Sequence, residues 1–331
     1  KTEAVTGNCS PKDFETMMQL TYLTFTAPRR DDDAFASYKN RSKAELQNMD
    51  LNPSSSFSDS ITSTLYSKHP RTLRMKADMV DKMNYDKILS MYQDRFKDAS
   101  DFTFILVGNV DVEAVKPLIE SYLGSLPSIN RKETFKDNHI AMRKGICKNE
   151  FIRQQETPKV NNFICYSGTC KYNLRNEILM SMTDQLLNFI YTEKVREDEG
   201  GTYGVYPMGQ LIKYPTEKAV LQIFFNTAPD KQEKLIKIIY DEAEAFAKNG
   251  PDEASLNKVK EYMLKKHSED LKENGYWLNS IDEYLYTGID PVKDYEQIIN
   301  SITPKDVQQF ANELLKQKNQ ITVSMISPEK K

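Results

Sequence analysis

Apolar side chains recur at intervals of three and four residues along much of the chain, and this spacing predicts helices. The clearest case is residues 175–196, where Ile178, Met182, Leu186 and Phe189 fall on one helical face. Helices are predicted at residues 11–25, 32–48, 84–97, 112–123, 175–196, 231–248, 252–273 and 303–316, with shorter ones near 57–66 and 276–286. Runs rich in β-branched and aromatic residues predict strands at residues 102–107, 145–154, 161–167, 202–205, 219–226 and 321–326.

The pattern of elements repeats within the chain. Residues 102–108 align without a gap with residues 321–327, which lie 219 positions later, and an amphipathic helix precedes each copy. Three further matches come before it in the same order: Ser10-Pro11 with Ala228-Pro229, Asp31 with Asp252, and Ser60-Ile61 with Ser280-Ile281. Four matches in one order at nearly constant spacing indicate an internal duplication.

Long helices with strands bunched at one end of each copy predict an α+β fold of two homologous layered domains. In each, helices pack on one face of a mainly antiparallel sheet. A repeat of 219 residues means that 331 residues hold one whole copy and about half of another. The first domain is therefore expected to be truncated at its N-terminus. We predict a partial domain at residues 1–127, a linker at 128–142 and a complete domain at 143–331.

Charge and hydropathy narrow the classes of function. Forty-five basic and 48 acidic side chains give a net charge of −3, whereas a nucleic-acid binder needs a clustered surplus of Lys and Arg. No apolar run reaches the length of a membrane span, so no transmembrane segment and a soluble chain are predicted. The compartment stays open between the periplasm and the cytoplasm of a bacterium.

The motifs of a self-contained enzyme are missing from the sequence. The three histidines, His69, His139 and His267, are far apart, so neither HExxH nor HxxEH occurs. His69 lies in a turn signal, and His267 lies in a Lys-rich amphipathic helix, where we expect it to be solvated. No phosphate-binding loop, dinucleotide glycine motif or nucleophile elbow appears either. We therefore predict no metal site and no cofactor site in these residues.

One stretch carries candidate chemistry. The helix at residues 175–196 runs into Gly200-Gly201, where we expect the left-handed conformation that ends helices, and a strand begins at Thr202. Arg196 and Tyr203 thus lie seven residues apart on either side of a turn. A structural explanation is available, because Arg is favoured near helix C-termini and Tyr is common in strands. The functional explanation is that a guanidinium and a phenol converge on a peptide backbone.

The segment at residues 193–205, E-K-V-R-E-D-E-G-G-T-Y-G-V, resembles the R-x6-Y stretch in the C-terminal half of pitrilysin-type zinc metallopeptidases, the inverzincin or HxxEH family. Residues 102–127 look like the strand and helix that close a domain in that family. The resemblance covers essentially the whole chain, and the repeat matches a family built from four homologous α/β domains. It implies that these residues are the latter part of the third domain and the whole fourth.

The resemblance also implies a division of labour. The family keeps HxxEH and its zinc in the first domain, so zinc is expected in an N-terminal half and the fragment alone is expected to be inactive. Arg196 would then bind the substrate backbone, and Tyr203 would help to stabilise the tetrahedral intermediate. The implied partners are a peptide or unfolded polypeptide, held in a closed chamber, and the zinc-bearing half, in the same chain or in a separate subunit.

Two other functions remain compatible with the sequence. The same family contains non-catalytic subunits that serve in structure or interaction, and retention of Arg196 and Tyr203 argues against that role only mildly. The chain would also suit an unrelated peptide- or ligand-binding α/β module in which the repeat builds a bilobed cleft. Separate, buried positions for Arg196 and Tyr203 would favour that module.

Overall fold

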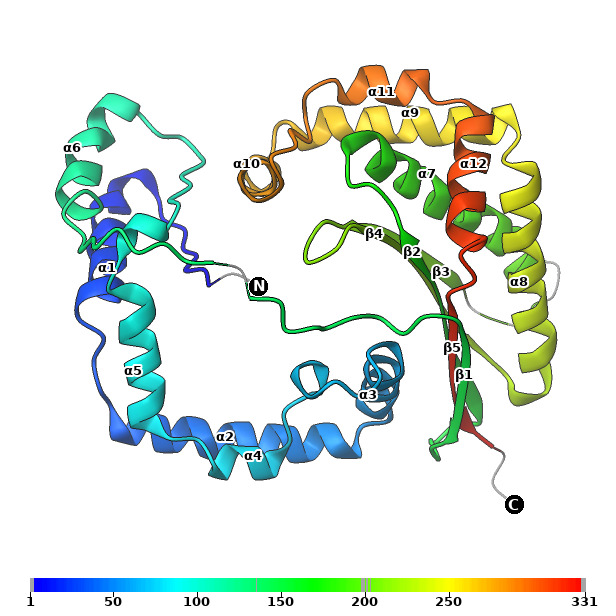
Figure 1. Ribbon diagram of the computed structural model, residues 1–331, viewed down its shortest axis with the longest axis horizontal. Coiled ribbons are helices and arrows are strands. Elements are labelled where there is room, and N and C mark those ends of the chain that lie inside the picture. Colours follow the sequence, from blue (N-terminus) through cyan, green and yellow to red (C-terminus); the bar gives the residue numbers. More distant parts are fainter. Residues whose placement is uncertain (1–2, 135, 198–199, 201, 203, 329–331) are drawn as a thin grey trace. The chain divides into compact units, whose positions relative to one another are not determined.

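The computed structural model describes residues 3–134, 136–197, 200, 202 and 204–328. The chain divides into two compact units, one of Lys1–Asn48 with Met75–Lys136 and the other of Met49–Arg74 with Asp137–Lys331 (Figure 1). The second unit thus takes in a segment, 49–74, that the sequence assigns to the first domain. The boundaries predicted at residues 127 and 143 stay a prediction about the homologous repeats. None of the helices in the described part of the chain is long and apolar enough to cross a membrane.

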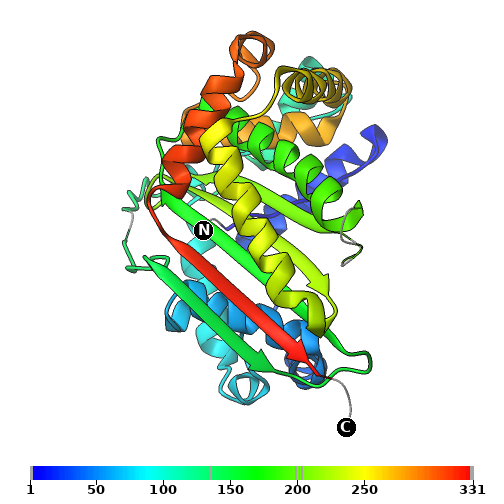
Figure 2. The same ribbon diagram turned by 90° about the vertical axis from the view of Figure 1, so that its right-hand side faces the viewer.

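The second unit is built on one five-stranded sheet, which Figure 2 shows with α8 lying across it. Its strands are β1 (Ile146–Ile152), β2 (Lys159–Thr169), β3 (Val205–Ile212), β4 (Lys218–Thr227) and β5 (Gln320–Ser327). The order is β1-β5-β2-β4-β3, with β1 parallel to β5 and the other three pairs antiparallel. The predicted α+β class with a mainly antiparallel sheet is confirmed.

Helices cover one face of this sheet in two layers. The inner layer is α7 (Leu174–Tyr191), α8 (Gln232–Asn249) and α12 (Pro304–Leu315), and α9 (Glu253–Asp270) and α11 (Tyr295–Ser301) pack against α7. A 3-10 turn (Pro229–Lys231) precedes α8, and α10 (Asn274–Thr287) follows α9. Apolar side chains of these helices and of the even-numbered positions of β2 form the main core, which buries Ile164, Ile178, Leu186, Leu221 and Leu235.

The opposite face of the sheet is covered by a helix from earlier in the chain. Helix α3 (Pro53–Leu65) packs its Ile61 and Leu65 against Phe163, Val220 and Val323. This second cluster explains why residues 49–74 belong to the second unit. Since both faces of β2 and β5 are covered, these strands are buried along most of their length, although polar residues such as Asn162 and Ser324 occur in them.

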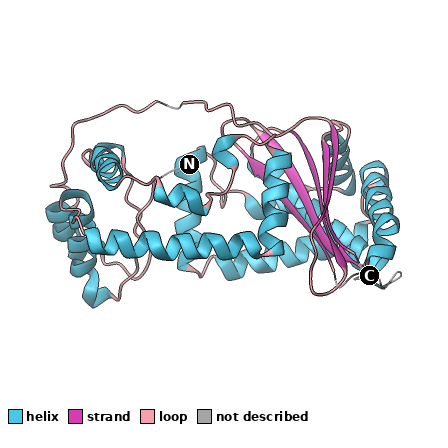
Figure 3. Ribbon diagram, turned by 90° about the horizontal axis from the view of Figure 1, so that it is seen from below, coloured by secondary structure: helices cyan, strands magenta, loops and turns pink. Residues whose placement is uncertain are grey.

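The first unit consists of helices around a small aromatic core. Phe25 meets Phe96 and Phe102 edge to face, with ring centroids 5.0 and 4.8 Å apart. Its elements are a 3-10 turn (Pro11–Asp13), α1 (Phe14–Thr26), most of α2 (Asp32–Leu51), α4 (Ala77–Asp81), α5 (Tyr85–Phe96), a second 3-10 turn (Ala99–Asp101) and α6 (Val112–Tyr122). Figure 3 shows all strands of the described residues gathered in the other unit's sheet.

The strand predicted at residues 102–107 is therefore wrong for this structure. The segment has no strand assignment, and Phe104 is 37% exposed. A strand requires a hydrogen-bonded neighbour, and no described residue of this unit forms one. The segment is rich in β-branched and aromatic residues, but this composition alone does not provide a neighbouring strand.

The order of elements confirms the internal duplication. In the first copy a 3-10 turn is followed by α1, α2, α3, α4 and α5, and in the second by α8, α9, α10, α11 and α12. Residues 102–107 then occupy the place that β5 holds in the second copy. The two copies differ in that only the second has its sheet among the described residues.

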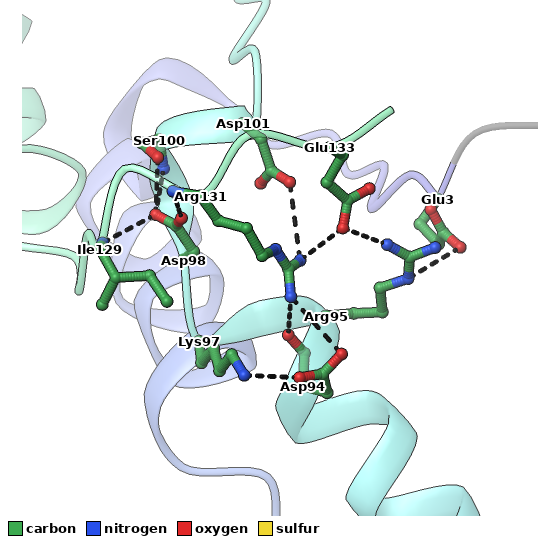
Figure 4. Close-up of polar contacts among 10 residues, drawn as sticks. All are labelled: Glu3, Asp94, Arg95, Lys97, Asp98, Ser100, Asp101, Ile129, Arg131 and Glu133. Atoms are coloured by element: carbon green, nitrogen blue, oxygen red, sulfur yellow. Dashed lines mark hydrogen bonds and ion pairs between the residues drawn. The ribbon is translucent and has the colours of Figure 1, made fainter. Parts of the chain in front are cut away.

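A buried carboxylate ties the predicted linker to the first unit (Figure 4). Asp98 is fully buried and accepts hydrogen bonds from the N–H groups of Ile129 (3.0 Å) and Arg131 (2.6 Å). The backbone N–H and hydroxyl of Ser100 also donate to it, at 3.1 and 2.7 Å. The guanidinium of Arg131 forms ion pairs with Asp94, Asp101 and Glu133. Residues 127–133 are thereby held in place although they have no regular secondary structure.

Candidate functional site

The structure describes the backbone of one of the two predicted site residues. Arg196 lies in a π-helical turn, Thr192–Glu197, that continues α7, but its side chain is outside the description. Tyr203 lies outside the described residues altogether. The convergence of the guanidinium and the phenol therefore stays a prediction. The structure describes the helix end before the pair and the strand start after it.

The helix end that carries Arg196 is held by buried side chains, both in the α-helix and in the π-helical turn that follows it. Sequence predicts one helix over residues 175–196, whereas α7 ends at Tyr191 and a π-helical turn follows. Tyr191 and Val195 are both fully buried, and the Tyr191 hydroxyl donates to the carbonyl of Ile239 at 3.4 Å. Wider π-helical turns are rare and occur frequently at functional sites.

The strand start on the other side of the turn is also defined. Gly200 has φ +56°, so it takes the left-handed conformation that the sequence predicts for this glycine. The Thr202 hydroxyl donates to the carbonyl of Gly204 (3.0 Å) and accepts from its N–H (3.2 Å), and Val205 is buried at the start of β3. The described residues on the two sides of this turn, Val195 and Val205, are thus both buried.

Helix α7 packs closely against β3, and the turn connects these two elements. A Cβ added to Gly209 of β3 would lie 2.4 Å from the Sδ and 3.2 Å from the carbonyl oxygen of Met180 on α7. The N–H of Gly209 donates to the Asp184 carboxylate of α7 at 3.0 Å. Because β3 is an edge strand, this bond satisfies a donor that no neighbouring strand could reach.

The Asp184 carboxyl makes this contact dependent on pH. Burial raises the pKa of Asp184 to about 6, in spite of the hydrogen bond from Gly209. Since the folded pKa exceeds the usual value near 4, the stabilising contribution is complete below about pH 4 and is lost as the pH rises through about 6. We expect folding to be less favourable by roughly 2 kcal/mol at about pH 7 than at about pH 4 from this group.

Asp184→Asn should remove that dependence, because the amide oxygen still accepts from Gly209 and does not titrate in this range. Urea unfolding of both proteins at about pH 4.5 and about pH 7 measures it. The difference between wild type and variant cancels contributions from other groups. An identical change with pH in the two proteins would contradict the argument.

A cavity of about 510 Å³ lies beside the N-terminal half of α7. One of its lining residues is buried, contrary to the prediction from sequence. The cavity is lined in part by His267, Tyr276 and Tyr295. His267 was expected to be solvated, but it is 6% exposed, stacks on Tyr295 at 4.4 Å and contacts the Tyr276 hydroxyl through Nδ1 at 3.2 Å. The histidine faces inward because α10 and α11 supply rings that cover it, which the spacing within α9 cannot reveal.

The same cavity brings two carboxyl groups together. Glu177 of α7 and Glu283 of α10 both line it, and Tyr172 donates to Glu283 Oε1 at 2.9 Å. Burial, together with the charge of Glu283, raises the pKa of Glu177 to about 7. Glu177 can therefore hold a proton near neutral pH. Sequence reasoning missed this pair because the two residues are more than a hundred positions apart and only the tertiary fold joins them.

The described residues contain no cluster of side chains that could bind a metal ion, since no three of His, Cys, Asp or Glu are placed to hold one. Cys165 is buried in β2, and burial raises the pKa of its thiol to about 12, which leaves it unreactive.

Comparison with known proteins identifies the family of this chain. Residues 82–263 match the family model described as the peptidase M16 inactive domain, which is more than half of the chain. The chain belongs to the peptidase M16 family. Pitrilysin-type zinc metallopeptidases are that family, so the resemblance drawn from the sequence is confirmed.

Individual M16 proteins agree with the family match. A zinc protease PQQL-like protein of Arabidopsis thaliana is 24% identical over 294 residues, 81% of this chain and 30% of its own. The crystal structure of the periplasmic protease PqqL from Escherichia coli superposes with a TM-score of 0.81 at 18% identity, covering 96% of this chain and 35% of PqqL. The structure of the first half of PqqL gives 0.75 at 15% identity, covering 96% and 71%.

The M16 comparisons also define the limits of this chain. It spans about a third of the length of the curated relatives that it matches. The matched model is the inactive domain of the family, in keeping with a sequence that has no HxxEH. The fold and the family are thus established, whereas activity, substrates and partners belong to the proposal below.

Proposed function

We propose that this chain is the substrate-binding C-terminal half of an M16-type zinc metallopeptidase that hydrolyses peptides or small unfolded polypeptides in a closed chamber. Zinc is held by an N-terminal half, in the same chain or a separate subunit, and no metal is bound here. The observation that carries the proposal is the match of residues 82–263 to the inactive M16 domain. Relatives named as zinc proteases favour this role over a non-catalytic scaffold.

The anchored turn supports the roles proposed for the two site residues. Arg196 and Tyr203 lie between Val195 and Val205 in the sequence, and both valines are buried. A guanidinium offers several donors in a fixed plane and suits the carbonyl oxygens of an extended peptide. The Tyr203 hydroxyl donates to the oxygen that becomes negative as water attacks the scissile carbonyl. A fixed frame is what such donors require, since their value depends on being placed before the reaction.

Substitution in the whole enzyme tests the two roles. Tyr203→Phe is expected to lower kcat roughly a hundredfold with little change in KM, because the lost hydroxyl acts only on the developing oxyanion. Arg196→Ala is expected to raise KM about tenfold, because it removes binding present in the ground state as well. Steady-state hydrolysis of a fluorogenic peptide gives both constants.

Tyr206→Phe is the matched control, because Tyr206 lies three residues further on, in β3, and is 59% exposed. It should leave both constants unchanged. Unchanged turnover in Tyr203→Phe would overturn the role proposed for that hydroxyl. Hydrolysis by residues 1–331 alone, in zinc-supplemented buffer, would overturn the division of labour. The compartment of the enzyme, periplasm or cytoplasm, stays open.

A further inference from the structure

The cavity beside α7 combines an apolar lining with carboxyl groups. It lies wholly within the second unit, between α7, α9, α10 and the start of α11, and its volume of about 510 Å³ is that of a small-molecule site. Its apolar lining includes Leu174, Ile178 and Met263, and its carboxyl groups belong to Glu177, Asp270 and Glu283. Apolar walls with a few charged groups are typical of ligand-binding pockets.

Two of these carboxyl groups have no cationic partner. Asp270 forms an ion pair with Lys266, which also lines the cavity. Glu177 and Glu283 contact each other and the neutral hydroxyl of Tyr172, and neither forms an ion pair with a Lys or Arg of the described ranges. Because no cation neutralises them, burial and the nearby charge of Glu283 raise the pKa of Glu177 to about 7. A bound cation would remove this repulsion.

A buried histidine in the same lining has a ring nitrogen without a partner. His267 is only 6% exposed, and its Nδ1 lies 3.2 Å from the Tyr276 hydroxyl. Its Nε2 has no hydrogen-bond partner among the residues that the structure describes. Buried polar atoms are normally paired, so Nε2 favours a bound group that completes its hydrogen bonding. With the proton on Nδ1, Nε2 is an acceptor.

The chemistry of the acceptors selects the kind of cation. Glu177, Glu283 and His267 all line the cavity, yet they are not placed to hold a metal ion. A metal needs its ligands within about 2–2.6 Å of one point, whereas the hydrogen bonds of an ammonium group are longer, at about 2.7–3.2 Å. A primary ammonium has three N–H donors, one for each of the three acceptors.

We propose that this cavity binds an alkylammonium group, with the nitrogen hydrogen-bonded to Glu177, Glu283 and His267. The alkyl chain packs on the apolar lining of the cavity. Free amines and the side chain of lysine both carry this group. The site is separate from the turn that carries Arg196 and Tyr203, so the proposal does not rest on the proposed function.

The test is a titration of the whole protein with n-butylammonium chloride, followed by methyl NMR. Met263 is 4% exposed and lines the cavity, so its methyl signal should shift and saturate with a Kd of about 1 mM. The methyl signal of Met91, which is 61% exposed and belongs to the first unit, should not move. n-Butanol has the same number of heavy atoms but no charge and should bind at least about tenfold more weakly.

Variants locate the bound nitrogen. Glu177→Gln and Glu283→Gln should each weaken n-butylammonium binding about tenfold, because each removes a charge-assisted hydrogen bond. Asp282→Asn is the matched control, because it makes the same change of charge next to Glu283 at an exposed position outside the cavity lining. It should leave the affinity unchanged. If a variant fails to fold, the comparison of n-butylammonium with n-butanol in the wild type still decides.

A peptide with blocked ends and one lysine, compared with its norleucine analogue, separates the two sources of the group. Binding of the lysine peptide alone assigns the site to side chains, whereas binding of n-butylammonium without either peptide assigns it to free amines. No shift at Met263 would overturn the proposal. Equal affinity for n-butanol would do the same, as would unchanged affinity in both glutamine variants. None of these readouts uses peptidase activity, so their failure would leave the proposed function untouched.

Discussion

Replacing Gly209 with valine is expected to destabilise the second unit more than any other single change in the frame of the candidate site. The new Cβ would lie within 2.6 Å of two side-chain atoms of Met180, and Met180 is only 1% exposed, so it has little room to move. The carbonyl of Met180 at 3.2 Å belongs to the helix backbone and yields less still. Overpacking of this kind costs about 1–3 kcal/mol for a methyl group, and valine adds two more carbons.

The effect should reach the turn that carries Arg196 and Tyr203, because α7 and β3 would be pushed apart. Chemical denaturation measures the loss, and Met180→Ala combined with Gly209→Val should recover part of it by making room. Gly275→Ala is the control, since nothing lies within 4 Å of its added methyl group and alanine favours a helix. Additive effects of the Met180 and Gly209 substitutions would show that the two residues are not in steric contact.

Asp98→Ala is expected to release residues 127–133 from the first unit. The substitution removes the acceptor for four hydrogen bonds at once and leaves the N–H groups of Ile129 and Arg131 without their partner. We expect a melting temperature several degrees lower and rapid amide exchange at both residues. Asp94→Ala serves as the control, because its carboxylate is 58% exposed, its ion pair with Lys97 is exposed, and its contact with Arg131 is long, at 3.5 Å.

The charge of Asp98 gives the same contact a pH dependence of opposite sign to that of Asp184. Burial acts to raise its pKa, but the hydrogen bonds from Ser100, Arg131 and Ile129 outweigh burial and hold the pKa well below the usual carboxyl range. The stabilising contribution is therefore present above about pH 4 and is lost as the pH falls toward the folded pKa. A ratio of Ile129 exchange rates between Asp98→Asn and wild type that does not fall as the pH is lowered toward the folded pKa would contradict this assignment.

Much of the fold could be predicted from local patterns. Every long helix predicted from the spacing of apolar residues is present, and Asp111 caps α6, accepting from the N–H groups of Glu113 and Ala114. The repeat was detectable because matched residue types recur in the same order, for example at Ile61 and Ile281. These features depend on neighbours within a few residues, so a single sequence contains them.

The failures share one physical cause, which is dependence on distant partners. Residues 102–107 have the composition of a strand but no hydrogen-bonded neighbour among the described residues of their unit. His267 was taken as solvated because its own helix is rich in Lys, whereas rings from two other helices bury it. The site pair Arg196 and Tyr203 could be named from sequence, but its geometry lies outside the described residues and stays a prediction.

By itself, the sequence determined the helices, the duplication, the family and the absence of a local zinc motif, because periodicity, order and short motifs are properties of the chain read in one dimension. Only the tertiary structure decided that α3 covers the sheet while α10 does not, and that Glu177 meets Glu283. The same apolar helix face is buried in one copy and exposed in the other, since burial depends on which surface is within reach and not on the residues alone.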